Sequence, residues 1–231
     1  MFIILAGCEY SGTSTIAKSI TSELKNSLGT EFDVHDHWKF PNIECYPQYS
    51  KQYVLNDADR RDISHFTPKL KEMLQRQSLV YHLPEPIDSL DRIYVGYHFD
   101  DTVYGPIYFG YGGPEEPQGG PRTRYARYIE KEIIKSYPNA ILIQLTASPE
   151  TILNRSKNKP HGNQIIVPHD IKAILEQFQS EFDKSLIQNK LTIDTTNQSV
   201  GQTSLAVING ILNYCTPEDT ARIKINKLLS Q

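Results

Sequence analysis

Apolar and polar positions alternate along the chain in a way that predicts strands followed by helices. Residues 1–6, MFIILA, form a short run that is apolar throughout, which is typical of a buried strand. The next segment places apolar residues at helical spacing, at Ile16, Ile20, Leu24 and Leu28. The chain therefore opens with a predicted strand, a glycine-containing loop and a helix.

The same alternation continues to the end of the sequence. Further strands are predicted within residues 31–38, 91–99, 139–147 and 190–196. Helical spacing is found within residues 67–82, 122–137, 148–157, 170–188, 204–214 and 216–230. Strands that alternate with helices predict an α/β protein with a five-stranded parallel sheet and helices on both faces. No internal repeat and no linker is visible, so residues 1–231 are predicted to form a single domain.

Residues 104–122, YGPIYFGYGGPEEPQGGPR, are predicted to form a long loop because glycine and proline are frequent there. The aromatic side chains in and before this segment are dense enough to line a pocket for a flat base. They are equally consistent with simple packing of the loop against its own domain.

Composition excludes several classes of protein. The 24 lysines and arginines stand against 27 acidic residues, a net charge of −3, which argues against nucleic-acid binding but leaves a local basic face open. No stretch approaches the ~20 apolar residues of a membrane span. The three scattered cysteines fit a reducing compartment, so we predict a cytoplasmic protein.

The segment GCEYSGTST, residues 7–15, carries the clearest chemical signal. A loop with the pattern G-x-x-x-x-G-K-[ST] between a strand and a helix binds phosphate through backbone N–H groups, a lysine and a hydroxyl on Mg²⁺. Gly7, Gly12 and Ser14 match this pattern, and Thr13 replaces the lysine. We predict phosphate contacts from Gly7, Ser11, Gly12, Thr13, Ser14 and Thr15, with Ser14 also binding the metal. An ordinary strand-to-helix turn is the alternative.

Because threonine stands at position 13, the positive charge that the lysine would bring to the phosphates must come from another residue. Losing one charge-assisted hydrogen bond to phosphate costs roughly 1.5–3 kcal/mol. Arg155 is the preferred substitute, helped by Arg122 or Arg124, which follow two glycines and a proline. A solvated helix face is the alternative for Arg122 and Arg124.

With these motifs the chain resembles the thymidylate kinase and deoxynucleoside kinase branch of P-loop kinases. The glycine loop and residues 148–170 carry the resemblance, which implies the three-layer P-loop NTPase fold and a lid at about residues 156–170. It further implies that Arg155 lies over the nucleotide and that Asp36 approaches the phosphoryl acceptor. Gly96 and Tyr97 stand where the branch has an Asp-Arg pair. Kinases of this branch are commonly dimers, so a homodimer is possible.

Carboxylates and histidines complete the set of candidates. Asp36 is the preferred general base or metal-associated group, with Asp100 and Asp101 as rivals after the third predicted strand. His35 and His37 share one face of a predicted strand, but no third ligand has a suitable neighbourhood, so a metal site on them is not favoured.

These observations predict a kinase that transfers the γ-phosphoryl group of ATP, with Mg²⁺, to a nucleoside, a nucleoside monophosphate or a related small hydroxyl compound. Two alternatives stay open. The missing lysine and the missing Asp-Arg pair are consistent with a nucleotide-binding protein that performs no transfer. The aromatic segment and the exposed arginines are consistent with a kinase that acts on a modified base in DNA.

Overall fold

The apolar runs of the sequence pair side by side in one parallel sheet. The computed structural model describes residues 1–29, 31–36, 56–84, 91–113, 121–161 and 164–229. Within these ranges five strands follow the spatial order β2-β3-β1-β4-β5, with every neighbouring pair parallel. The strands are β1 (Phe2–Ala6), β2 (Phe32–Asp36), β3 (Asp91–Val95), β4 (Ile141–Thr146) and β5 (Asn189–Asp194). The predicted five-stranded parallel sheet is confirmed.

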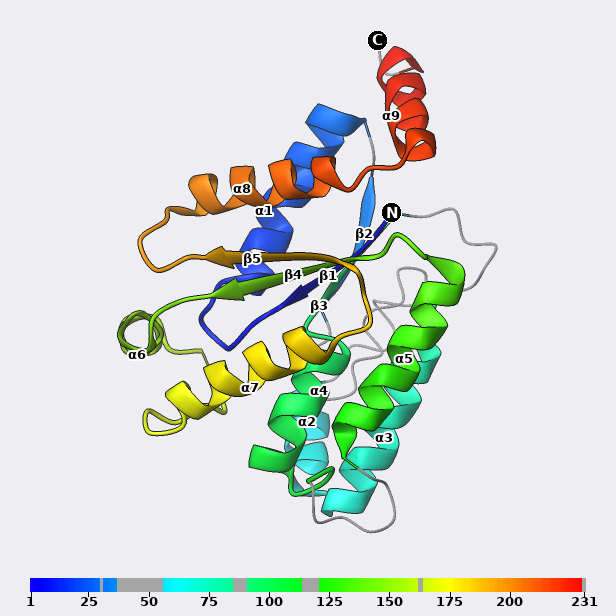
Figure 1. The fold of residues 1–231 in the computed structure, drawn as a ribbon. Helices are drawn as coiled ribbons and strands as arrows, with labels where there is room; N and C mark the ends of the chain where they lie inside the picture. Colours follow the sequence, from blue (N-terminus) through cyan, green and yellow to red (C-terminus); the bar gives the residue numbers. More distant parts are fainter. Residues whose placement is uncertain (30, 37–55, 85–90, 114–120, 162–163, 230–231) are drawn as a thin grey trace.

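Helices cover both faces of this sheet (Figure 1). One layer contains α1 (Thr13–Leu28), α8 (Val200–Asn213) and α9 (Pro217–Leu229). The opposite layer contains α3 (Pro68–Tyr81), α4 (His98–Tyr104), α5 (Arg122–Ser136) and α7 (Ile171–Lys184). Two further helices are α2 (Asp57–His65) and α6 (Pro149–Asn158).

The central strand β1 explains why two layers form. Its alternate side chains point to opposite faces, as the pleat of a strand requires. Ile3 and Leu5 pack into the core beneath α1 and α8, whereas Phe2, Ile4 and Ala6 pack into the core beneath α5 and α7. A strand that is apolar on both faces must be covered on both faces, which the continuous run MFIILA predicted.

The region after β3 is helical where the sequence predicted a strand end and a loop. The strand ends at Val95, and α4 begins at His98. A π-helix, η2 (Gly105–Phe109), continues from α4 into the segment expected to be a long loop. Tertiary packing explains the error, because Phe99 and Val103 are buried on the inner face of α4. Residues 114–120 of the predicted loop lie outside the described residues.

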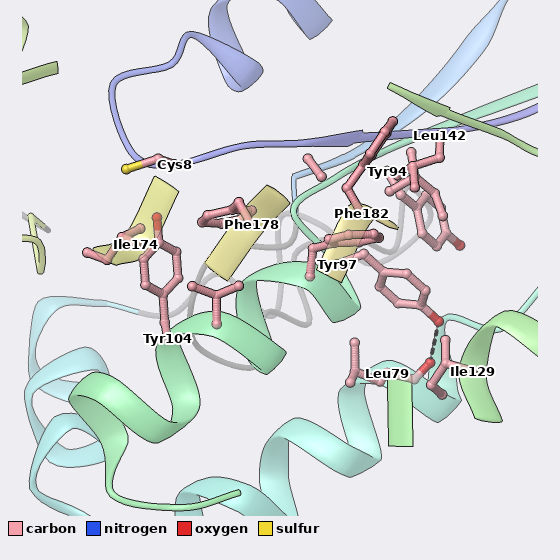
Figure 2. Packing of buried hydrophobic residues seen from close by; sticks show 14 of the residues in the cluster. Cys8, Leu79, Tyr94, Tyr97, Tyr104, Ile129, Leu142, Ile174, Phe178 and Phe182 are labelled. Carbon is pink, nitrogen blue, oxygen red and sulfur yellow. Dashed lines mark hydrogen bonds between the residues drawn. The ribbon is translucent and has the colours of Figure 1, made fainter. Parts of the chain in front are cut away.

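Most of the aromatic residues in this region build the core and do not form an open pocket. Tyr94, Tyr97 and Phe99 are almost completely buried, and the Tyr97 hydroxyl donates to the Leu79 carbonyl at 2.6 Å. Figure 2 shows the Tyr97 hydroxyl pointing toward Leu79, and Tyr104 rising from α4 toward Cys8 of the glycine loop.

The helix α3 forms as predicted, but its apolar stripe is not its buried face. Leu70 and Met73 are 42% and 58% exposed, whereas Gln75, Ser78 and Leu79 are buried. The spacing of apolar residues therefore predicted the position of this helix correctly. Leu70 and Met73, which contribute to that spacing, do not lie on its buried face.

Two expectations from composition are addressed by the described residues. Cys8 and Cys215 are free thiols, while Cys45 lies outside these ranges. None of the helices described combines the length and the apolar character needed to cross a membrane.

Candidate functional site

The glycine loop between β1 and α1 needs glycine at two positions, for different reasons. A Cβ at Gly7 would lie 2.4 Å from the Leu145 carbonyl oxygen and 2.5 Å from the Ser11 Oγ, so the chain can pass β4 there only without a side chain. Gly12 has φ +105°, a conformation that favours glycine. Gly7 thus allows the loop to pass close to β4, and Gly12 forms the turn at which α1 begins.

The first turn of α1 is open to an anion. Gly12 occupies the N-cap position with no side-chain cap, and the first turn contains no acidic residue. An uncapped N-terminus presents backbone N–H groups and the positive end of the helix dipole. A phosphate group matches both.

Ser11 supplies an independent sign of a ligand. Its side chain is 0% exposed, and its Oγ has no hydrogen-bond partner among the described residues. Buried hydroxyl groups nearly always have a partner, and an unsatisfied one costs about 1–3 kcal/mol. A polar ligand atom in the loop would supply the missing bond.

Asp36 lies at the carboxyl end of β2, beside the start of α1. Burial raises the pKa of Asp36 above its ordinary value, while a hydrogen bond with Ser14 and the charge of Lys18 oppose that rise. The structure thus brings together the carboxylate and the hydroxyl that the sequence nominated for acceptor and metal. Both residues line the same cleft.

Asp100 enters the cleft from the first turn of α4, the helix that follows β3. β2 and β3 are neighbours, with Asp36 opposite Val95, and the chain turns out of β3 through two residues with positive φ, Gly96 at +74° and Tyr97 at +51°. A Cβ at Gly96 would lie 2.4 Å from the Asp100 Oδ2, so this glycine makes room for the carboxylate. Left-handed backbone at a non-glycine residue is costly and concentrates at functional sites.

Arg155, in the last turn of α6, reaches the glycine loop. Its Nη1 donates to the Tyr10 carbonyl at 2.9 Å and to the Thr195 Oγ1 at 3.0 Å, and its Nη2 donates to the Thr195 carbonyl at 2.6 Å. Partial burial lowers the pKa of Arg155, and Asp194 opposes that shift. The guanidinium therefore connects the glycine loop to the end of β5.

Side chains of the glycine loop also hold the predicted lid. The Glu9 Oε2 accepts from the backbone N–H groups of Ile165 and Ile166, at 3.2 and 3.0 Å. Tyr10 has φ +65°, stacks on the His161 ring at 5.0 Å and donates from its hydroxyl to the Gln164 Oε1 at 2.6 Å. The described residues of the lid are thus docked on the loop.

Together these elements enclose a cleft of about 730 Å³. That volume suits a small molecule, because such pockets span roughly 300–1,000 Å³. The described lining comes from the glycine loop and the start of α1, the ends of β2 and β3, α4, the end of α6 with the residues that follow it, the segment after β5 and the start of α8. It consists of Gly7, Glu9, Tyr10, Ser11, Gly12, Thr13, Ser14, Thr15, Ile16, Asp36, Val95, Asp100, Tyr104, Arg155, Asn158, Lys159, His161, Thr195, Gln198, Ser199, Val200 and Thr203.

Arg122 and Arg124 are not among the described residues of this lining. Arg122 is 1% exposed and forms an ion pair with Asp101 and another with Glu72 at 3.5 Å. Arg124 is exposed on α5. The sequence placed both arginines near the phosphates, and the structure places one in the core and the other on the surface. Their neighbour Asp101, a rival for the base, is buried with Arg122.

Histidine does not mark a metal centre among the described residues. No group of three potential ligands from His, Cys, Asp and Glu occurs there. His35 is buried and faces Asp33 at 2.7 Å, while His37 lies outside the described ranges.

Sequence reasoning missed several residues of the cleft. Glu9 and Tyr10 occupy variable positions of the loop pattern, so the motif attached no role to them. Thr195 was included in the last predicted strand, whereas in the structure it directly follows β5. Tyr104 accepts the Glu9 backbone N–H at 2.9 Å, although it was read only as one of many aromatics.

Comparison with known proteins agrees with this fold. No protein-family model matches the sequence, and no curated protein is similar to it by sequence. Solved structures do match: the YorR protein of Bacillus subtilis, determined with phosphorylated GDP, is 20% identical with a TM-score of 0.58, covering 91% of this chain and 95% of its own. Thymidylate kinase of Candida albicans is 16% identical with a TM-score of 0.55, covering 92% of this chain and 91% of its own.

The class of protein follows from the sheet order and these neighbours. The chain has the P-loop NTPase-like kinase fold, with the glycine loop between the central strand and α1. At this level of identity the likeness establishes the fold, and function must be argued from the site itself.

Proposed function

We propose that this protein is an ATP-dependent phosphotransferase. The observation that carries the proposal is the cleft at the start of α1. There the uncapped helix N-terminus and the unpartnered Ser11 hydroxyl face the same space as the Asp36 carboxylate. An anion-binding loop and a carboxylate in one cleft are the parts that phosphoryl transfer requires.

The residues present fit a nucleotide triphosphate and its metal. Gly7, Ser11, Gly12, Thr13, Ser14 and Thr15 would hold the phosphates at the N-terminus of α1. The Ser14 hydroxyl would supply an oxygen ligand, the type of donor that Mg²⁺ prefers. When bound, Mg²⁺ neutralises charge on the transferring phosphoryl group.

Asp36 is proposed to orient the acceptor hydroxyl and to take its proton. Burial raises the pKa of Asp36, which brings a carboxylate closer to the range where a general base is effective near neutral pH. Asp100 lies in the same cleft and is the second candidate for this step.

Arg155 is proposed to contribute to phosphate binding in part through the shape of the loop. Its hydrogen bonds to the carbonyls of Tyr10 and Thr195 fix the loop against the end of β5. Its charge adds to the positive potential of the cleft, in place of part of the lysine lost at Thr13.

The proposed acceptor is a nucleoside, a nucleoside monophosphate or a related small hydroxyl compound. The two structural neighbours support this class, because one is a thymidylate kinase and the other was determined with a guanine nucleotide. The volume of the cleft is also consistent with small ligands.

A product screen tests the proposal. Purified protein is incubated with Mg²⁺, γ-³²P-labelled ATP and each of a panel of nucleosides, monophosphates and sugars, and the products are separated. We expect a labelled product from at least one acceptor and none from the Asp36→Asn variant. A panel without product, from a protein that binds ATP, would contradict transfer.

That result would favour a second candidate, a nucleotide-binding protein without transfer activity. Two observations support it: Thr13 stands at the lysine position, and the Arg155 guanidinium already binds two backbone carbonyls. This candidate predicts tight ATP binding, no labelled product and no release of inorganic phosphate.

A further inference from the structure

The cleft contains few positive charges for a site that would bind a triphosphate. Among the described residues that line it, the basic side chains are Arg155, Lys159 and His161. Lys18 is exposed on α1 and is not part of the described lining. Within the described lining of the cleft, the positive charge that Thr13 does not provide is therefore found only in residues 155–161.

Two of these three side chains already have other contacts. Arg155 donates three hydrogen bonds to Tyr10 and Thr195, which orient its guanidinium along the protein surface of the loop. His161 stacks on Tyr10, and its Nε2 lies 3.3 Å from the Glu9 Oε1. Both side chains are therefore already held in position by contacts with the glycine loop or with Thr195.

Lys159 differs from both. It is exposed, and its ammonium group forms no ion pair or hydrogen bond within the described residues. Its backbone N–H donates to the Arg155 carbonyl at 3.0 Å, which fixes the chain at the C-terminus of α6. An unpaired ammonium group in the wall of a cleft gains most from an anionic ligand.

The contacts on either side of Lys159 hold it beside the loop. Arg155 precedes it and donates to the Tyr10 carbonyl at 2.9 Å, and His161 follows it and stacks on the Tyr10 ring at 5.0 Å. The segment that carries Lys159 is thus attached at both ends to the same loop residue. Lys159 and Thr13 line the same cleft, and the flexible four-carbon side chain of a lysine can adjust to an anion bound there.

We infer that Lys159 is the phosphate-binding lysine of this protein, supplied from the end of α6 in place of the lysine missing at Thr13. The inference rests on the proposed function and adds a specific residue to it. It assigns Arg155 to holding the loop and Lys159 to direct contact with the terminal phosphates of the nucleotide.

Calorimetric titration of ATP with Mg²⁺ tests this inference. Lys159→Gln should weaken ATP binding by about tenfold to a hundredfold, the loss expected for one charge-assisted hydrogen bond. Lys157→Gln is the matched control, because Lys157 is exposed on the same helix and is not in the described lining. This control should stay within about twofold of the native protein, where a lost surface charge has little effect.

A second variant separates a phosphate contact from a structural role. Lysine introduced at position 13 of the Lys159→Gln protein should recover most of the lost affinity, because it restores the charge from the other side of the cleft. Adenosine should bind the native protein and Lys159→Gln equally, since it carries no phosphate.

The outcomes distinguish the inference from the proposed function. Native protein that fails to bind ATP overturns both. Native protein that binds ATP while Lys159→Gln binds it equally well overturns the inference alone. An equal loss in Lys157→Gln, or an equal loss of adenosine binding, also overturns it, because the effect would then not be specific to phosphate.

Discussion

Arg122 and Arg155 carry the same guanidinium group in opposite surroundings. Arg122 is enclosed in the core, paired with the carboxylate of Asp101 and stacked over Tyr125 at 4.4 Å. Arg155 lies at the edge of the cleft, where its donors go to carbonyl oxygens. Arg122 neutralises the buried charge of Asp101, and Arg155 connects the glycine loop to the residue after β5 through hydrogen bonds.

The difference shows that the residues next to an arginine in the sequence do not determine whether its side chain is buried. Arg122 follows two glycines and a proline, a context in which a phosphate site is reasonable. Its partner Asp101 comes from another helix, and burial raises the pKa of that carboxyl while Arg122 opposes the rise. A buried charge must be paired, so the interior position of Arg122 follows from Asp101 and could not be deduced from its own neighbours.

The largest expected effect concerns this buried pair. Arg122→Ala should lower the free energy of unfolding by about 3–5 kcal/mol, because it leaves Asp101 buried without its partner. Urea denaturation measures the change. Arg124→Ala, an exposed arginine on the same helix, should stay within about 0.5 kcal/mol of the native protein. Equal effects of the two substitutions would remove the distinction between core and surface.

The next effect concerns the cleft. Asp36→Asn should reduce turnover by roughly a hundredfold or more, the contribution expected of a general base. Asp100→Asn should reduce it less, if Asp36 takes the proton of the acceptor. Steady-state kinetics on the acceptor found in the product screen measure both. A greater loss in Asp100→Asn would transfer the role to Asp100.

A smaller effect is expected from substitution of Arg155, the arginine at the edge of the cleft. Arg155→Ala should reduce turnover by at least tenfold, an order expected for an arginine that supports the transferring group. Its cost in unfolding free energy should be about 1–2 kcal/mol, below that of Arg122→Ala, because water can replace its donors at a half-exposed site. A positioning role predicts that KM for ATP and kcat both change; unchanged turnover would remove Arg155 from the mechanism.

The smallest expected effect is a pH dependence of stability that comes from a buried histidine, His82. Burial lowers the pKa of His82 to about 4, with the Ser78 carbonyl opposing and the charges of His35 and Arg92 adding to the shift. The unfolded chain therefore takes up a proton below about pH 6.5 while the folded protein does not, so stability is lost as pH falls. The loss between pH 7 and 5.5 should be about 1 kcal/mol.

A matched pair of variants isolates this contribution. His82→Gln should reduce the pH dependence of the urea midpoint over that range. His65 makes the same contact to a carbonyl four residues earlier, 2.7 Å in both cases, but is exposed. His65→Gln is the control for the substitution itself, and it should keep the free energy of unfolding at pH 7 within about 0.5 kcal/mol of the native value. An unaltered slope in His82→Gln would show that other groups cause it.

Much of the fold could be predicted because its signals are local. The apolar runs that form β1 and β4 cannot be exposed, and the glycine loop follows directly from a strand that ends and a helix that begins. The end of β3 could not be predicted in this way. The turn at Gly96 and Tyr97 depends on packing of α4 beneath the sheet, which no local pattern contains.

The same contrast between local signals and long-range contacts applies to the residues of the candidate site. Ser14 and Asp36 were found because each lies at the end of an element that the sequence marks clearly. Thr195 and Glu9 were missed because their contacts join distant parts of the chain: the bond from Arg155 to Thr195 spans 40 positions, and the bond from Ile165 to Glu9 spans 156. Such pairs become visible only when the sheet order places strand ends side by side.

The cleft at the start of α1 is proposed to bind the phosphates of a nucleotide. Calorimetric titration of the native protein with ATP and Mg²⁺, beside the same titration of Ser14→Ala, tests it most directly. We expect saturable binding of one nucleotide per chain, weakened by about tenfold in the variant, which lacks the hydroxyl proposed to bind the metal. Absence of binding, or equal binding by the two proteins, would contradict it.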